Sequence, residues 1–126
     1  AAQVLPMDGE IMALQAKIWA KQGREIENAY DYAMALVKQD PTDIMAWDTL
    51  GRVIAVREGI EPALDVVGRV GEIATTCSSL FEQLGDLYVA AGDKKQARDA
   101  YTRAIELSDD GLVVVPQVRK KLRDVK

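Results

Sequence analysis

The sequence contains no histidine, and this absence narrows the chemistry that the chain can perform. Histidine is the commonest general base and the commonest neutral metal ligand in proteins. A nucleophile activated by histidine and a zinc site with histidine ligands are therefore excluded for this sequence. The sequence also has no glycine-rich phosphate loop and no clustered metal-ligand motif. We accordingly predict no catalytic residues, no metal site and no cofactor.

Cysteine is almost as scarce, because Cys77 is the single one and cannot form an intramolecular disulfide. One thiol is compatible with a reducing compartment and also with the periplasm. No apolar run approaches the ~20 residues of a membrane span, and we expect no signal peptide in the sequence as given. The expectation is a soluble protein, cytoplasmic or periplasmic. Because the first residue is alanine, we expect a processed chain or a part of a longer one.

Positive charge is in deficit, with 16 Lys and Arg against 20 Asp and Glu and a net charge of −4. A nucleic-acid partner is not expected, because phosphate binding requires a basic surface. The 126 residues, 48% of them hydrophobic, suffice for one globular core without disulfides or metal.

A 34-residue repeat organises the sequence. The residues Trp47, Leu50, Gly51 and Ala63 recur 34 positions later as Phe81, Leu84, Gly85 and Ala97. Apolar character is kept at the same interval between Ile54 and Tyr88, Val67 and Tyr101, and Val70 and Ala104. Self-similarity at such a period indicates a helical repeat protein.

Turn and capping residues divide each repeat into two helices of roughly 14 residues, a usual length. Gly59 and Gly92 interrupt the two complete copies near their middle. Ser79 with Glu82 predicts a capping box at one helix start, and Asp93 with Gln96 predicts a cap for the next helix.

The pattern resembles the tetratricopeptide repeat, because large, small and aromatic residues recur in that family's order. The resemblance implies an all-α fold, a right-handed superhelix of antiparallel helix pairs. We expect a single domain over residues 1–126, with a degenerate repeat at about 10–43, further repeats at 44–77 and 78–111, and a C-terminal capping helix at about 113–125. In the first repeat Lys17 replaces the expected glycine. The resemblance also implies that Gly85 and Ala97 let two helix backbones approach closely.

The resemblance implies a concave groove lined by the first helix of each repeat, which holds a peptide or helix of another protein. The groove positions that carry over to this sequence are Ile11, Leu14, Gln15, Ile18, Met45, Asp48, Thr49, Arg52, Ser79, Glu82, Gln83 and Asp86. A subfamily that binds acidic chaperone tails uses lysine, asparagine and arginine here. Its clamp is missing, since the matching places hold Leu14, Ile18, Thr49, Ser79 and Gln83.

The groove is expected to be apolar at its N-terminal end and acidic further along, where Asp48, Glu82 and Asp86 outweigh Arg52. Such a surface favours a partner segment with apolar anchors followed by lysine or arginine. The alternative interpretation is that these carboxylates belong to a solvated helix face.

The C-terminal residues combine positive charge with an apolar stripe. The cations are Arg119, Lys120, Lys121, Arg123 and Lys126, and the stripe is Val115, Val118, Leu122 and Val125. A membrane or nucleic-acid patch is one interpretation. We favour a capping helix, because the stripe suits packing on the preceding repeat and cations are stabilised near a helix C-terminus.

The sequence therefore favours a non-catalytic protein-interaction scaffold. The alternative is a structural or self-associating module, or an excised part of a longer repeat protein in an assembly. An enzyme ranks last, because the chain offers only scattered carboxylates and Cys77. The partner's identity, the pathway and the compartment do not follow from the sequence.

Overall fold

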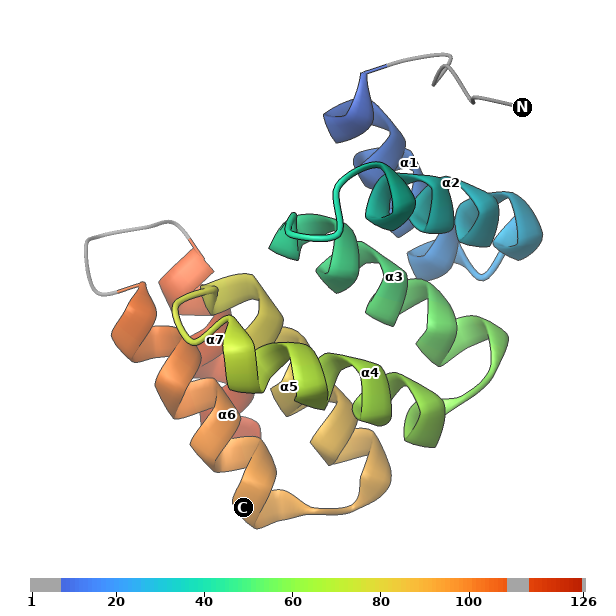
Figure 1. Cartoon of the computed structure of the whole chain (residues 1–126). Coiled ribbons are helices and arrows are strands. Elements are labelled where there is room, and N and C mark those ends of the chain that lie inside the picture. Colours follow the sequence, from blue (N-terminus) through green and yellow to red (C-terminus); the bar gives the residue numbers. More distant parts are fainter. Residues whose placement is uncertain (1–7, 109–113, 126) are drawn as a thin grey trace. The chain divides into compact units, whose positions relative to one another are not determined.

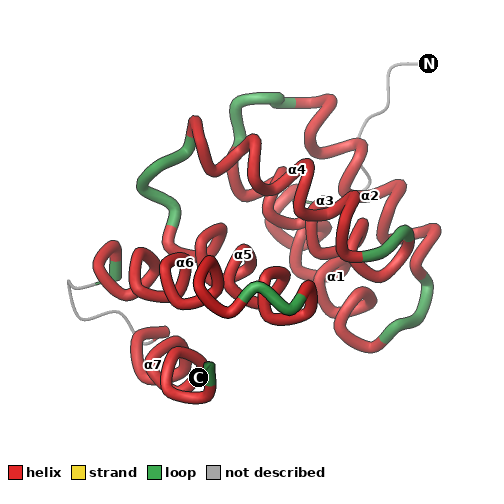
Figure 2. Tube along the Cα trace, turned by 90° about the horizontal axis from the view of Figure 1, so that it is seen from below, coloured by secondary structure: helices red, strands yellow, loops and turns green. Residues whose placement is uncertain are grey.

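The computed structural model describes residues 8–108 and 114–125. Within these residues the regular structure is helical and contains no strand (Figure 2). The helices are α1 (Gly9–Gln22), α2 (Ile26–Gln39), α3 (Ile44–Arg57), α4 (Ile60–Ile73), α5 (Ser78–Ala91), α6 (Lys94–Leu107) and α7 (Val114–Asp124).

The helices recur at the interval found in the sequence. α2, α4 and α6 begin at residues 26, 60 and 94, so each starts 34 residues after the one before. α3 and α5 begin at residues 44 and 78, again 34 residues apart. Figure 1 shows the paired helices running in alternate directions. Within each unit, short connections of this kind make α1 and α2, and α5 and α6, antiparallel neighbours.

Aspartates cap three of the helices. Asp8, Asp43 and Asp93 precede α1, α3 and α6, and each carboxylate accepts a hydrogen bond from a backbone N–H of the first turn. The predicted cap at Asp93 is confirmed, since Gln96 N donates to its Oδ1 at 3.1 Å. The predicted box of Ser79 and Glu82 is wrong. With Ser79 as the cap, α5 would begin at residue 80, but it begins two residues earlier, at Ser78, after Cys77, which makes no side-chain capping bond.

The chain divides into two compact units, unit 1 (residues 1–63) and unit 2 (residues 64–126), and the boundary falls within α4. The expectation that the whole chain forms one domain stays a prediction. In unit 1, α1, α2 and α3 pack against one another. Five of their eleven buried apolar residues are alanine, and the full set is Met12, Ala16, Ala20, Ala29, Ala33, Leu36, Val37, Ala46, Leu50, Val53 and Ile54. Small side chains allow the helices to approach closely.

In unit 2, α5 packs against α6, and α7 packs against α6 in turn. The core here combines Ala97, Tyr101 and Ala104 of α6 with Val118 of α7. Leu122 and Val125 are partly buried against this cluster, so the predicted capping helix is confirmed. The side chain of Val115 and residue Lys126 lie outside the described residues.

Gly85 has a more specific role than the sequence indicated. A Cβ atom at this position would lie 2.8 Å from Cζ of Tyr101 and closer still to Cδ1 and Cε1. Real Cβ atoms essentially never approach so closely. The neighbour that requires glycine is therefore an aromatic ring, and the expectation that Gly85 serves backbone approach is corrected accordingly.

Candidate functional site

The outer side of α1 is apolar and exposed. Ile11, Leu14 and Ile18 are 55%, 57% and 40% exposed. They follow the i, i+3, i+7 spacing of one helix face, and the buried residues Met12, Ala16 and Ala20 occupy the other side of α1. α1 is thus apolar on both sides, with only one side used by unit 1. We name the outer side, Ile11, Leu14 and Ile18, the α1 apolar face; Gln15 lies half-buried beside it.

A pocket of about 550 Å³ lies where the first turn of α1, the end of α2 and the start of α3 come together. It is lined by Asp8, Gly9, Glu10, Ala13, Leu36, Gln39, Asp40, Asp43, Met45 and Ala46. Four of these residues are acidic, and no lysine or arginine is among them. We call this feature the acidic pocket.

Local backbone geometry fixes three of the pocket's carboxylates. Oδ1 of Asp8 accepts from Glu10 N at 2.8 Å, and Oδ1 of Asp43 accepts from Met45 N at 3.1 Å. Oδ1 of Asp40 accepts from the hydroxyl of Thr42 at 2.6 Å and from its backbone N at 3.1 Å. The hydroxyl of Thr42, followed by its backbone N–H, lowers the pKa of Asp40 from its ordinary value, so this group is charged at neutral pH.

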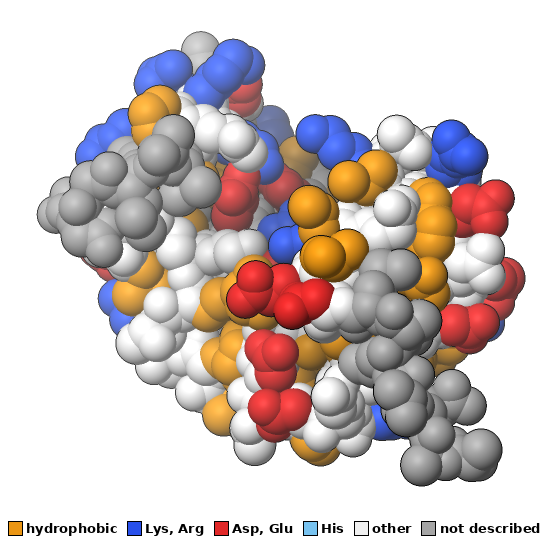
Figure 3. All heavy atoms as spheres, turned by 90° about the horizontal axis from the view of Figure 1, so that it is seen from above, with side chains coloured by type: hydrophobic (Ala, Val, Ile, Leu, Met, Phe, Trp, Pro, Cys, Tyr) orange, Lys and Arg blue, Asp and Glu red, His pale blue; other side chains and the backbone are white. Residues whose placement is uncertain are grey.

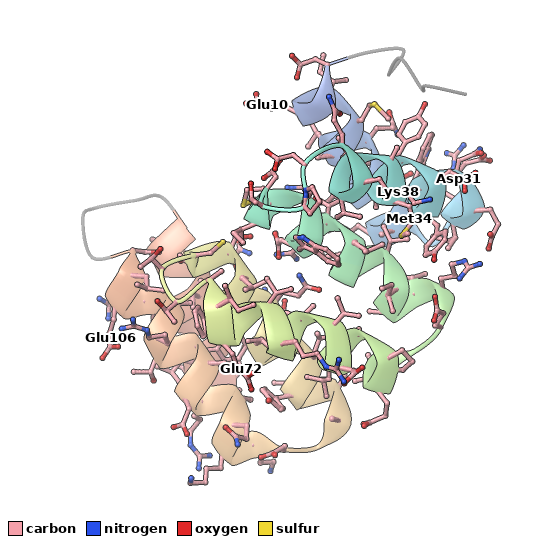
Figure 4. The ribbon with its side chains drawn as sticks, viewed as in Figure 1. Glu10, Asp31, Met34, Lys38, Glu72 and Glu106 are labelled. Atoms are coloured by element: carbon pink, nitrogen blue, oxygen red, sulfur yellow. The ribbon has the colours of Figure 1, made fainter. Side chains whose placement is uncertain are left out.

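The acidic pocket adjoins the α1 apolar face. Glu10 and Leu14 are four residues apart on α1 and therefore lie on the same side of the helix. Glu10 extends from the N-terminal end of α1 (Figure 4). Met45 continues the apolar character on α3, since it lines the pocket and is 42% exposed. Figure 3 shows hydrophobic side chains gathered beside acidic ones on the exposed surface.

Two of the four predicted groove positions of α3 are inaccessible. Asp48 and Thr49 are fully buried. Asp48 pairs with Arg52 at 3.5 Å, and the Thr49 hydroxyl donates to the carbonyl oxygen of Met45 at 2.9 Å. The expectation that Asp48 is an exposed groove charge is therefore wrong. A carboxylate can be buried on a helix when an arginine one turn later neutralises it.

The acidic positions of α5 are occupied by the chain itself. Nζ of Lys121 on α7 lies 2.7 Å from Oε2 of Glu82 and 3.0 Å from Oδ2 of Asp86. Nε2 of Gln117 also donates to Glu82, at 2.9 Å. Glu82 is buried, contrary to the expectation of an open acidic groove. Of the other predicted positions here, Ser79 is half-buried and Gln83 is buried.

This cluster shifts the pKa of two of its members, Lys121 and Tyr101. Burial lowers the pKa of Lys121, but its hydrogen bonds to Glu82 and Asp86 together outweigh that effect and raise the pKa above its ordinary value. The Tyr101 hydroxyl donates to Asp86 at 2.5 Å. Burial, followed by this bond, raises the pKa of Tyr101. The cluster joins α5, α6 and α7 and is structural in character.

Sequence reasoning identified the α1 apolar face and missed the acidic pocket. A signal for it was present. Asp8 and Asp43 are N-caps of successive first helices, and first helices of a repeat array run in the same direction. Their caps therefore gather at one end, where the end of the intervening helix brings Asp40. Lys121 was assigned to a general basic tail, because the sequence pattern does not indicate that it contacts Asp86, which lies 35 residues earlier in the chain.

No group of three or more His, Cys, Asp or Glu side chains within residues 8–108 and 114–125 is arranged to hold a metal ion. None of the helices in that part of the chain is both long enough and apolar enough to cross a membrane.

Several solved structures are similar to this chain. A thermophilic TPR protein of Thermus thermophilus superposes with a TM-score of 0.79 at 21% identity, over 95% of this chain, which spans 64% of that protein's length. PcrH in complex with the chaperone-binding region of PopD gives 0.74 at 15% identity, over 98% of this chain and 96% of that one. MamA gives 0.62 at 20% identity, over 93% of this chain and 66% of that one.

At these identities the similarity concerns the fold, and it confirms the predicted class of helical repeat. No curated protein sequence matches the chain. The family profile described as a tetratricopeptide repeat-like domain matches residues 8–126. The profile therefore covers the two described segments and the residues between them. The chain belongs to the tetratricopeptide repeat-like family.

Proposed function

We propose that this chain is a non-catalytic protein-interaction module and that the α1 apolar face is where it contacts a peptide or helix of its partner. One observation carries the proposal: three large apolar side chains on one helix face are about half exposed. Full burial of such a side chain contributes about 1.5–3 kcal/mol, so a folded protein that leaves three exposed together has a surface suited to binding.

The wider comparison agrees with this proposal. The similar PcrH structure contains a segment of another protein, the chaperone-binding region of PopD. We propose a complex of the same general kind for this chain. Of the groove positions predicted from sequence, Ile11, Leu14, Gln15, Ile18 and Met45 form the proposed surface. Other members of the predicted set, such as Asp48 and Gln83, are buried and are not part of the proposed surface.

Selection from a random-sequence peptide library displayed on phage tests the proposal. Synthetic copies of the selected peptides should bind the parent chain saturably. The triple variant Ile11→Gln, Leu14→Gln, Ile18→Gln should lose most of that binding. Val89→Gln is the matched control, since Val89 is an apolar residue of α5 that is 48% exposed. Peptides that bind the triple variant and the parent equally would overturn the proposal.

Self-association is the second candidate, because an exposed apolar face is equally suited to a second copy. The acidic pocket argues against a symmetric pair in which the two α1 helices are parallel, because that pair would bring two sets of four carboxylates together, whereas an antiparallel pair would keep them apart. Molar mass from light scattering separates the candidates. A dimer that dissociates in the triple variant would favour self-association.

A further inference from the structure

We infer that the partner segment carries a lysine or arginine that enters the acidic pocket while its apolar side chains cover the α1 apolar face. This inference rests on the proposed function and specifies the chemistry of the partner. It places the acidic part of the binding surface at the N-terminal end of α1, whereas the sequence had placed it on α3 and α5.

The charge of the pocket is the first argument. Asp8, Glu10, Asp40 and Asp43 line one cavity, and none of them belongs to an ion pair within residues 8–108 and 114–125. The local hydrogen bonds of the three aspartates, which are caps for Asp8 and Asp43 and a turn for Asp40, each use Oδ1. Charge complementarity therefore selects a cationic group as the occupant.

The shape and lining of the pocket select a long cationic side chain. A volume of about 550 Å³ is sufficient for a lysine or arginine side chain. Ala13, Leu36 and Ala46 provide apolar lining beside the carboxylates. Lysine and arginine have an apolar stem and a charged end, and they bury the stem against such surfaces.

The position of the pocket sets the order of residues in the partner. Ile11 and Ile18 are seven residues apart, so the α1 apolar face is about 10 Å long at 1.5 Å per residue. The acidic pocket lies at the Ile11 end, because Gly9 and Glu10 line it. A matching segment thus has a basic residue at one end and apolar residues over the following ~10 Å.

The chain itself contains one example of this recognition. α7 places Lys121 between Glu82 and Asp86 of α5, while Val118 on the same helix is buried against α6. The acidic side of α5 is thus covered by α7, a helix that combines a lysine with apolar residues. The α1 surface offers the same two kinds of group to an external segment.

The peptides selected on the parent chain provide the test. We expect lysine or arginine at one end of the selected sequences and apolar residues over the rest. The pocket variant is Asp8→Asn, Glu10→Gln, Asp40→Asn, Asp43→Asn, in which asparagine keeps the ability to cap a helix. Synthetic selected peptides should bind this variant about fivefold to tenfold more weakly, the loss expected for removing a partly desolvated ion pair. The loss should shrink at high salt.

A matched control separates the pocket from the total charge. The variant Asp31→Asn, Asp65→Asn, Glu72→Gln, Glu106→Gln removes the same number of exposed carboxylates elsewhere. Asp31, Glu72 and Glu106 lie on other helices (Figure 4). It should weaken binding by less than about twofold, since its effect is only long-range. Circular dichroism should show both variants folded.

The outcomes distinguish the inference from the proposed function. Two results would overturn the inference and leave the proposed function standing. The first is selected peptides whose binding requires Leu14 but that lack basic residues. The second is peptides that bind the pocket variant as tightly as the control variant. Selected peptides that ignore the α1 apolar face would overturn both. A doubling of molar mass that is lost in the pocket variant would identify a second copy as the occupant and overturn the inference of a foreign segment.

Discussion

α1 and α5 are first helices of their pairs, and equivalent positions on them have opposite properties. Leu14 and Ile18 correspond to Glu82 and Asp86, each 68 residues later, which is two repeats. On α1 these positions are apolar and exposed. On α5 they are acidic and paired with Lys121 of α7. The charged surface is used inside the chain, and the apolar surface remains open.

The difference shows that a position within the repeat does not determine burial. The elements later in the chain matter as much, because α7 supplies both a cation and the buried Val118 to unit 2. A charged group is expected at the surface unless another element supplies the opposite charge. An apolar group is expected in the interior, but it stays exposed where no other element covers it. Three pairs of variants test this contrast between α1 and α5.

Among the positions that differ between α1 and α5, the largest effect is expected at Gly85, whose counterpart on α1 is Lys17, also 68 residues away. Gly85→Ala places a methyl group against the Tyr101 ring, which cannot move freely because its hydroxyl is bonded to Asp86. We expect a loss of about 1–3 kcal/mol in the free energy of unfolding, the usual cost of overpacking. Lys17→Ala should change it by less than about 0.5 kcal/mol. Urea unfolding followed by circular dichroism measures both, and equal effects would contradict the packing described for Gly85.

A smaller effect is expected from Lys121→Met, which keeps the apolar stem and removes the charge. The Lys121 side chain is 31% exposed, so we expect a loss of about 1–2 kcal/mol at neutral pH, below that for a fully buried charged hydrogen bond. Lys120→Met is the control. Lys120 pairs with Asp124 on the surface at 3.2 Å, and its replacement should cost less than about 0.5 kcal/mol.

The same pair of variants gives a pH dependence. Folding raises the pKa of Lys121 above its ordinary value of 10.5. A raised pKa contributes stability that is fully present below the ordinary value and is lost as the pH rises through the folded value. The difference in stability between the parent and Lys121→Met should therefore be constant near neutral pH and shrink above about pH 10.5. A difference that persists at higher pH would show that the lost packing, and not the charge, destabilises the variant.

Much of the fold could be predicted from the sequence because its causes are local or periodic. The interval between Trp47 and Phe81 locates one repeat against the next, and Asp93 marks a helix start whatever packs around it. The Ser79 cap was wrong because α5 already begins at Ser78, whose hydroxyl donates to a carbonyl oxygen of α6. The contact between the Tyr101 ring and Gly85 likewise depends on the distance between α6 and α5, and that distance cannot be read from the spacing of residues in the sequence.

The candidate site was predictable only in part. The exposure of Leu14 agrees with the expectation for the first helix, and that expectation came from the resemblance to the repeat family, because apolar spacing alone does not distinguish an exposed face from a buried one. The burial of Asp48 and Glu82 was missed. Asp48 is neutralised by Arg52 of the same helix, and Glu82 is neutralised by Lys121 of α7. Exposed charge is the default for helical carboxylates, and that default gives the wrong answer where a later element supplies a cation.

The smallest effect on stability is expected on the α1 apolar face, where Leu14→Gln should change the free energy of unfolding by less than about 0.5 kcal/mol. Leu14 is already half exposed, so glutamine of similar length meets water in both the folded and unfolded states. Met12→Gln on the opposite side of α1 is the matched comparison. Met12 is buried, and a polar amide there should cost more than about 2 kcal/mol. Thermal and urea unfolding of the two variants measure this contrast. If Leu14→Gln were as destabilising as Met12→Gln, Leu14 would be covered within the folded chain, and the α1 apolar face would not be available to a partner.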